Sequence, residues 1–128
     1  MRENRPGDEK PLHWVGSSKS DFLGFPEKVV DDVGYALGAV QLGGHPASAK
    51  IWKGLGPGVF EIVEDHRSGT YRAVYTVRFM KAVYVLHAFQ KKSRRGIATP
   101  KSELDLIGTR LARAKEDYEA WLRSRGFP

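Results

Sequence analysis

The pattern of apolar and polar positions divides the chain into helical and extended segments. A short apolar run at 12–16 ends in a Gly-Ser-Ser sequence and predicts a first strand. Pro26 suits a first helical turn, so we expect a break between two helical segments near Gly24-Phe25. Across this break apolar residues recur every three or four positions, which predicts one helical stripe made of Phe22, Phe25, Val29, Val33, Leu37 and Val40.

Two glycines interrupt the second helical segment. Gly34 and Gly38 lie four positions apart, and each costs roughly 1 kcal/mol relative to alanine inside a helix. We therefore expect them to permit close packing against another element. Gly43-Gly44 end the helix, and the glycine- and proline-rich residues 45–58 predict a long connection anchored by Ile51-Trp52.

Three strands are predicted in the middle of the chain. Residues 59–64 are rich in β-branched and aromatic side chains, and 65–69 form a turn. In 70–79 the apolar side chains from Tyr71 to Phe79 alternate with a second set that includes two arginines. Residues 82–90 are almost continuously apolar, which is typical of a strand covered on both faces. Together the three strands predict an antiparallel meander.

A long helix is predicted at the end of the chain. Thr99-Pro100 is a strong start signal and Gly126 closes the helix. Its apolar stripe consists of Leu104, Ile107, Leu111, Ala114, Tyr118 and Trp121. We expect one α+β domain at 12–128 after a flexible tail at 1–11. A curved antiparallel sheet, built from the N-terminal strand and the meander, carries the N-terminal helix or helices and the C-terminal helix on one side.

Composition excludes several classes of protein. A chain of 128 residues fits a single domain. It has no cysteine, which excludes a disulfide scaffold, a Cys-ligated zinc site, an iron–sulfur cluster and a thiol nucleophile. No apolar run approaches the roughly 20 residues of a membrane span, and the N-terminal residues lack the apolar core of a secretory signal. We expect a cytoplasmic protein.

The net charge of +6 is unevenly distributed. Residues 50–99 carry ten basic and three acidic side chains, and the densest basic run is Lys91-Lys92-Ser93-Arg94-Arg95. Such a run is either a solvated loop or a phosphate-binding patch. The four histidines lie far apart in the sequence, and neither a phosphate loop nor a nucleophile elbow is present, so we predict no metal and no cofactor.

Arg72 has two interpretations. It either pairs with a carboxylate, such as Glu61 across the hairpin, or projects from the open face of the sheet toward Lys91 and Lys92. In the second case the three cations would grip a phosphodiester and offset the charge of its pentacovalent transition state. With RNA as substrate the 2′-hydroxyl is the nucleophile, so this chemistry needs no metal. His87 is a candidate for proton transfer or a hydrogen-bonded core residue.

Four segments resemble the RelE/ParE superfamily of toxins from toxin–antitoxin modules, in particular its phage-derived, HigB-like branch. They are Gly58-Val-Phe-Glu-Ile62, Tyr71-Arg-Ala-Val-Tyr75, Tyr84-Val-Leu-His-Ala-Phe-Gln-Lys-Lys92 and Thr99-Pro100. The resemblance spans about residues 12–120 and implies a RelE-like fold. It further implies a messenger RNA endoribonuclease that acts in the ribosomal decoding site and inhibits translation, with a cognate antitoxin, expected to be a helix-turn-helix protein.

The resemblance also implies site residues. Arg72 matches the arginine that RelE-like toxins use on the phosphate, and Lys91 and Lys92 fall where the family places basic residues. We expect Arg72 and Lys91 to stabilise charge, and Lys92 or His87 to assist proton transfer. Candidates for RNA binding are Lys53, Arg94 and Arg95.

The sequence departs from the RelE pattern at two positions. Glu61 and Val63 stand where RelE carries lysines in the strand before the Tyr-Arg segment. Two alternatives therefore stay open beside the nuclease. One is a non-catalytic, gyrase-directed inhibitor of the ParE type, and the other is a remnant that binds nucleic acid or an antitoxin.

Overall fold

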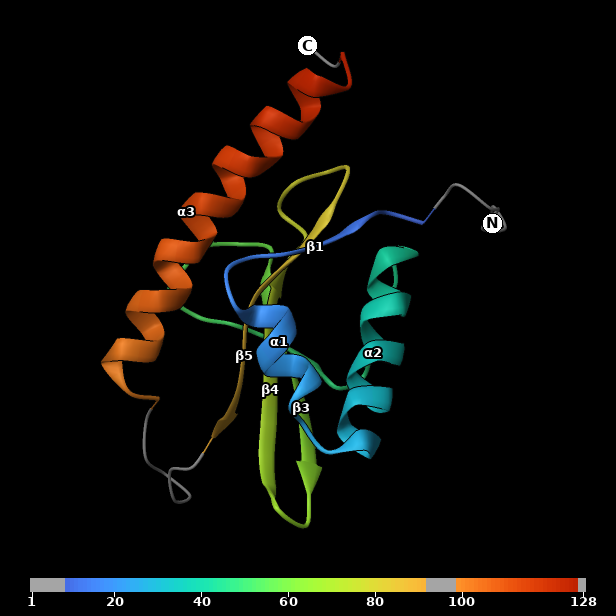
Figure 1. Cartoon of the computed structure of the whole chain (residues 1–128), viewed down its shortest axis with the longest axis vertical. Helices are drawn as coiled ribbons and strands as arrows, with labels where there is room; N and C mark the ends of the chain where they lie inside the picture. The colour runs from blue at the N-terminus through green and yellow to red at the C-terminus, as the bar shows by residue number, and fades with distance from the viewer. Residues whose placement is uncertain (1–8, 92–98, 127–128) are drawn as a thin grey trace.

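The computed structural model describes residues 9–91 and 99–126, which form a five-stranded sheet between helices (Figure 1). The helices are α1 (Ser18–Leu23), α2 (Glu27–Gln41) and α3 (Lys101–Ser124). The strands are β1 (Leu12–Trp14), β2 (Ala49–Ile51), β3 (Val59–His66), β4 (Gly69–Thr76) and β5 (Val83–Lys91). No helix in the described ranges is both long and apolar enough to cross a membrane.

The sheet has the strand order β1-β5-β4-β3-β2. The predicted antiparallel meander of β3, β4 and β5 is confirmed. The prediction of a wholly antiparallel sheet is wrong, because β1 pairs in parallel with β5, from Leu12 with Val83 to Trp14 with Val85. The direction of β1 depends on the path that the chain takes through α1 and α2. A three-residue apolar run contains no information about that path.

A strand was missed inside the predicted connection at 45–58. Ala49–Ile51 forms the edge strand β2, antiparallel to β3. Its three residues are flanked by glycine and proline, so local sequence carries little strand signal. Pairing with the β-branched strand β3 makes this segment extended, which is a tertiary effect.

Helices cover both faces of the sheet, so the expectation of helices on one side is wrong. In Figure 1, α2 and α3 lie on opposite sides of the strands. One core joins α1 and α2 to side chains such as Ala73 and Val85, and a second joins α3 to Val74 and Leu86. A register shift between Val74 and Tyr75 turns both Leu86 and His87 of β5 toward α3. The apolar character of β5 on both faces is thereby explained.

Gly34 and Gly38 do not serve the close packing expected of them. A Cβ on Gly38 would meet no described atom within 4 Å, and one on Gly34 would meet only Phe22 Cζ at 4.0 Å. Gly58 is different, because its φ is +84° and a Cβ would lie 3.2 Å from Arg78 Cα. The turn before β3 therefore requires glycine, whereas α2 does not.

The pairing register determines which side chains share the face covered by α3. Three successive rows on this face contain Lys50, Glu61, Val74 and His87, then Arg72 and Phe89, then Asp65, Thr70 and Lys91. The first turn of α3 contacts the row of His87 through Glu103. From there α3 runs away from the β3–β4 turn, so the rows of Arg72 and Lys91 lie beyond the start of the helix (Figure 1).

Candidate functional site

A shallow groove of about 310 Å³ lies where the start of α3 meets β2, β3 and β4. The sheet contributes Glu61 from β3 and Arg72 from β4, and α3 contributes Leu104 from its first turn. The groove is also lined by Ile51, Trp52, Lys53 and Thr99. It therefore brings together Arg72 and Lys53, two of the residues predicted from the sequence.

Arg72 and Glu61 form an ion pair on the floor of this groove. Arg72 Nη1 donates a hydrogen bond to Glu61 Oε1 at 2.7 Å, and the two side chains are only 17% and 11% exposed. The pairing of Arg72 with Glu61 is thus confirmed. Arg72 Nε and Glu61 Oε2 are buried and have no hydrogen-bond partner among the described residues. Buried polar atoms are normally paired, so this ion pair is only half satisfied.

Lys91 shares the sheet face of Arg72. In the register Arg72 lies opposite Phe89 and Lys91 opposite Thr70, which makes Lys91 a diagonal neighbour of Arg72 across the strand pair. Diagonal neighbours are about 7–8 Å apart, within reach of long side chains. The structure therefore allows Arg72 and Lys91 to approach one anion. Lys92, Arg94 and Arg95 lie outside the described residues.

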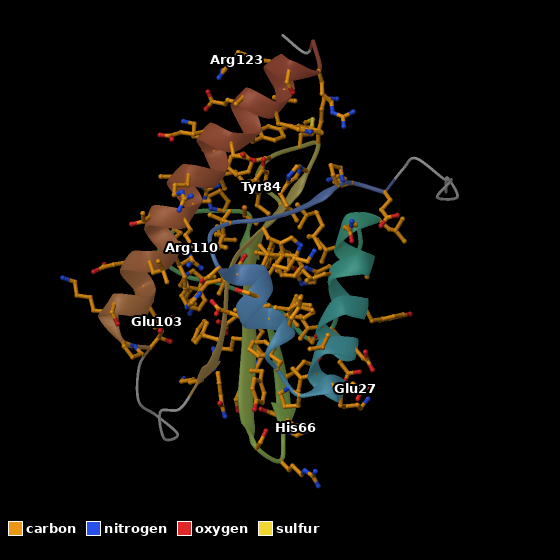
Figure 2. The ribbon with its side chains drawn as sticks, in the orientation of Figure 1. Glu27, His66, Tyr84, Glu103, Arg110 and Arg123 are labelled. Carbon is orange, nitrogen blue, oxygen red and sulfur yellow. The ribbon has the colours of Figure 1, made fainter. Side chains whose placement is uncertain are left out.

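His87 belongs to a buried hydrogen-bond network between β5 and α3 rather than to the groove lining. Its Nε2 bonds to the Glu103 carboxylate, and its Nδ1 lies 3.3 Å from Arg110 Nη1. An arginine only donates, so Nδ1 accepts and Nε2 carries the proton that is donated to Glu103. Both nitrogens are occupied, which matches the interpretation of His87 as a hydrogen-bonded core residue. In Figure 2, Glu103 and Arg110 project from α3 on the side of the sheet.

Arg110 holds this network together. Besides His87 it donates to the carbonyl oxygen of Leu86 and to Ser17 Oγ, both at 3.0 Å. Its guanidinium lies against Gly16, where an added Cβ would come within 3.0 Å of it. The role of Arg110 could not be predicted from its place on the long helix, because its hydrogen-bond partners are distant in the sequence.

Tyr75 and Tyr84 are buried. Burial raises the pKa of Tyr75 to about 12. Burial, together with a hydrogen bond to Asp117, also raises the pKa of Tyr84. Both hydroxyls therefore stay protonated near neutral pH and serve the two cores.

Three features of the groove were not predicted. Leu104 was expected in the core as part of the α3 stripe, yet it is 42% exposed, since the sheet beneath it forms the groove. Lys50 was assigned to a connection, but β2 places it opposite Glu61 on the groove face. Glu61 was considered only as a partner for Arg72. In the described part of the chain no three His, Asp or Glu side chains gather as metal ligands do.

Comparisons with known proteins agree with this architecture. None of the curated proteins matches the chain. Among solved structures, the isolated E. coli RelE toxin is similar with a TM-score of 0.53 and 20% identity, over 74% of this chain and 94% of that one. An arginine double mutant of E. coli RelE in the free state has a TM-score of 0.51 and 21% identity, over 66% of this chain and 85% of RelE. The expected RelE-like α+β fold is confirmed.

The sequence model of one protein family matches residues 20–112, from within α1 through β5 to the first half of α3. This agrees with the expected phage-derived family, and the similarity to the RelE structures is one of fold. The chain belongs to the family described as phage derived protein Gp49-like (DUF891).

Proposed function

We propose that the protein is the toxin of a toxin–antitoxin module and cleaves messenger RNA on the ribosome. The observation that carries this proposal is the half-satisfied Arg72–Glu61 pair on the floor of a groove. A guanidinium and a carboxylate that are 17% and 11% exposed at the groove floor suit a ligand that offers both a hydrogen-bond acceptor and a donor. A ribonucleotide does so, with its phosphate oxygens and its 2′-hydroxyl. The RelE-like fold and the family assignment support the same reaction.

The reaction follows from these groups. The 2′-oxygen attacks the adjacent phosphorus and the bond from phosphorus to the 5′-oxygen breaks, which leaves a 2′,3′-cyclic phosphate and a 5′-hydroxyl. We assign Glu61 to accept the 2′-hydroxyl proton once the phosphate engages Arg72. Arg72 and Lys91 offset the negative charge that develops on the nonbridging phosphoryl oxygens, and Lys92 is the candidate proton donor to the leaving oxygen. We assign His87 to positioning α3, because both of its nitrogens already have partners.

The proposal extends to partners and location. The basic residues of the open sheet face would contact ribosomal and messenger RNA, and an antitoxin of the helix-turn-helix class would neutralise the protein in the cytoplasm. The measurement is cell growth when the protein is expressed alone and together with an adjacent gene for a helix-turn-helix protein. Relief of growth inhibition by that gene is the expected result.

The test is cleavage of messenger RNA in a purified translation system, mapped by primer extension. The wild-type chain is expected to cut within coding sequence. Arg72→Ala and Glu61→Gln are each expected to slow cleavage by a factor on the order of 100, as removal of one oriented charge-stabilising group does. Thermal unfolding of each variant separates lost chemistry from lost fold.

The matched control is Arg123→Ala, in the last turn of α3 and remote from the groove (Figure 2). It should cleave like wild type. Uncut messenger with the wild-type protein would contradict the proposal. Growth inhibition together with intact messenger would favour the gyrase-directed alternative, which supercoiling assays measure directly.

A further inference from the structure

Leu104 is an apolar side chain held in an exposed position. The other members of the α3 stripe are buried or partly buried, whereas Leu104 faces the groove at 42% exposure. The preceding residue, Glu103, is tied to His87, and the amide N–H groups of Glu103 and Leu104 both donate to the Pro100 carbonyl oxygen. The first turn of α3 is thereby fixed, so Leu104 presents a preorganised apolar surface to any ligand.

Trp52 lines the same groove and belongs to the core beneath α3. It is buried, and its amide N–H donates to the Val59 carbonyl oxygen at 2.9 Å. The loop that follows is held by Arg78, which donates to the Pro57 carbonyl oxygen at 2.9 and 3.1 Å. Lys53 comes directly after Trp52 and also lines the groove. A cation thus lies on the β2 side of the groove.

The chemistry of this combination selects one class of ligand. An exposed leucine in a groove that also contains the cations Lys53 and Arg72 is complementary to a nucleotide, whose base is apolar on its faces and whose phosphates are anionic. The groove volume of about 310 Å³ is at the lower end of small-ligand pockets, so it holds one nucleotide rather than a duplex.

We infer that the groove recognises a nucleobase as well as a phosphate. Leu104 contacts the base of the nucleotide beside the scissile phosphate, and Lys53 contacts the next phosphate toward the β2 edge. This inference rests on the proposed function, since it takes Arg72 as the group that binds the scissile phosphate. It makes Leu104 a specificity residue and directs single-stranded RNA across the strands, from β4 toward β2.

The test pairs a protein variant with a substrate variant. The probe is a fluorescent RNA hexanucleotide made non-cleavable by a 2′-O-methyl group, and the readout is its anisotropy with the isolated protein at low salt. Leu104→Ala is expected to weaken binding about 3- to 10-fold. With an RNA that is abasic at the contacted nucleotide, the same substitution should change binding less than 2-fold, because the contact is already absent.

Lys53 is tested in the same way. Lys53→Ala should weaken binding of the intact RNA about 3- to 10-fold, and this loss should disappear when the next phosphate is replaced by a neutral methylphosphonate. The matched controls are Leu23→Ala, at a leucine of α1 that is 58% exposed, and Lys19→Ala on the same helix. Both should bind like wild type.

Each outcome decides the inference. An equal loss on intact and abasic RNA would overturn the base contact, as would no loss with Leu104→Ala or no RNA binding by wild type. Tighter binding of an acidic peptide than of RNA would show that the surface is a protein-docking site instead. If Leu104→Ala does not change cleavage on the ribosome, the proposed nuclease function stands and the base contact is overturned. If binding depends on the base but messenger RNA is not cleaved, the base contact stands and the proposed nuclease function is overturned.

Discussion

Arg110 is a buried cation that has no carboxylate partner among the residues that the structure describes. Its hydrogen bonds go to the Leu86 carbonyl oxygen, His87 Nδ1 and Ser17 Oγ, which lie on β5 and next to α1. One side chain therefore connects α3 to two other parts of the chain. The network stabilises the molecule only while every member is present, because a buried polar group that loses its partner keeps its full desolvation cost.

Replacing Arg110 by methionine is expected to destabilise the protein substantially. Arg110→Met keeps most of the side-chain volume but leaves the Leu86 carbonyl oxygen and His87 Nδ1 without donors. We expect the free energy of unfolding in urea to fall by about 2–4 kcal/mol. Arg113→Met, at an exposed position three residues later, is the control and should change stability by less than about 0.5 kcal/mol. Equal stability of the two variants would contradict the role of the network.

The ionised carboxylate of Glu64 destabilises the folded protein. Burial raises its pKa, and the neighbouring Asp32 and Asp65 add to the rise, against a smaller opposing effect of Lys28. A raised pKa in the folded state means that the ionised carboxylate opposes folding. The destabilisation by this charge is absent below the pKa that Glu64 has in the unfolded chain. It grows as the pH rises from the unfolded to the folded pKa, and it is complete above the folded pKa.

Glu64→Gln is therefore expected to raise the melting temperature at about pH 7 and to leave it unchanged at about pH 3, where both side chains are neutral. Thermal unfolding followed by circular dichroism at both pH values measures this difference. Glu119→Gln, on the exposed face of α3, is the comparison variant. A gain of the same size at both pH values would show that the charge of Glu64 is not its cause.

At the scale of elements, α2 contains glycines that its packing does not need. Gly34→Ala and Gly38→Ala place a methyl group where no described atom outside the adjoining helix backbone and chain neighbours approaches closer than 4.0 Å. Each substitution is expected to stabilise the protein by about 0.5–1 kcal/mol, because alanine loses less backbone entropy in a helix. Chemical unfolding of the single and double variants measures the gains and their additivity. Gly58→Ala should instead destabilise, since that position has a φ of +84°.

The elements themselves were largely predictable from the sequence. The three long strands, the break between α1 and α2, and α3 all follow from periodicity and from proline and glycine signals. Strand β2 did not, because Ala49–Ile51 is extended only through its pairing with β3. The parallel direction of β1 and the second helical layer likewise depend on contacts between segments far apart in the chain.

The site was predictable in part, for the same reason. Arg72 was identified as a basic residue in an otherwise apolar strand, and its ion pair with Glu61 follows from hairpin geometry. The exposure of Leu104 was not predictable, because its helical spacing is that of a core residue and only the sheet beneath it forms a groove. The network of His87 was also hidden, since Glu103 and Arg110 belong to another element.

At the scale of the whole molecule, the positive charge has a defined location. Lys53, Arg72 and Lys91 belong to the groove and to the sheet face that continues from it. If all three contact phosphates, the logarithm of RNA affinity should fall with the logarithm of salt concentration with a slope of about −2. Anisotropy titrations over a range of salt concentrations measure it. Lys53→Ala should reduce the slope by about 0.7, and Lys115→Ala, on the outer face of α3, should leave it unchanged.

The parallel pairing of β1 with β5 has a consequence for folding kinetics. Leu12 pairs with Val83, so β5 gains its second neighbour in the sheet only by closing a loop of about seventy residues. Closing this loop costs chain entropy before β1 and β5 make any stabilising contact. Because of this cost, such non-local contacts slow folding. During synthesis the N-terminal helices also emerge well before β5. The first fifty residues must therefore wait for the second half of the chain before one of their own strands can join the sheet.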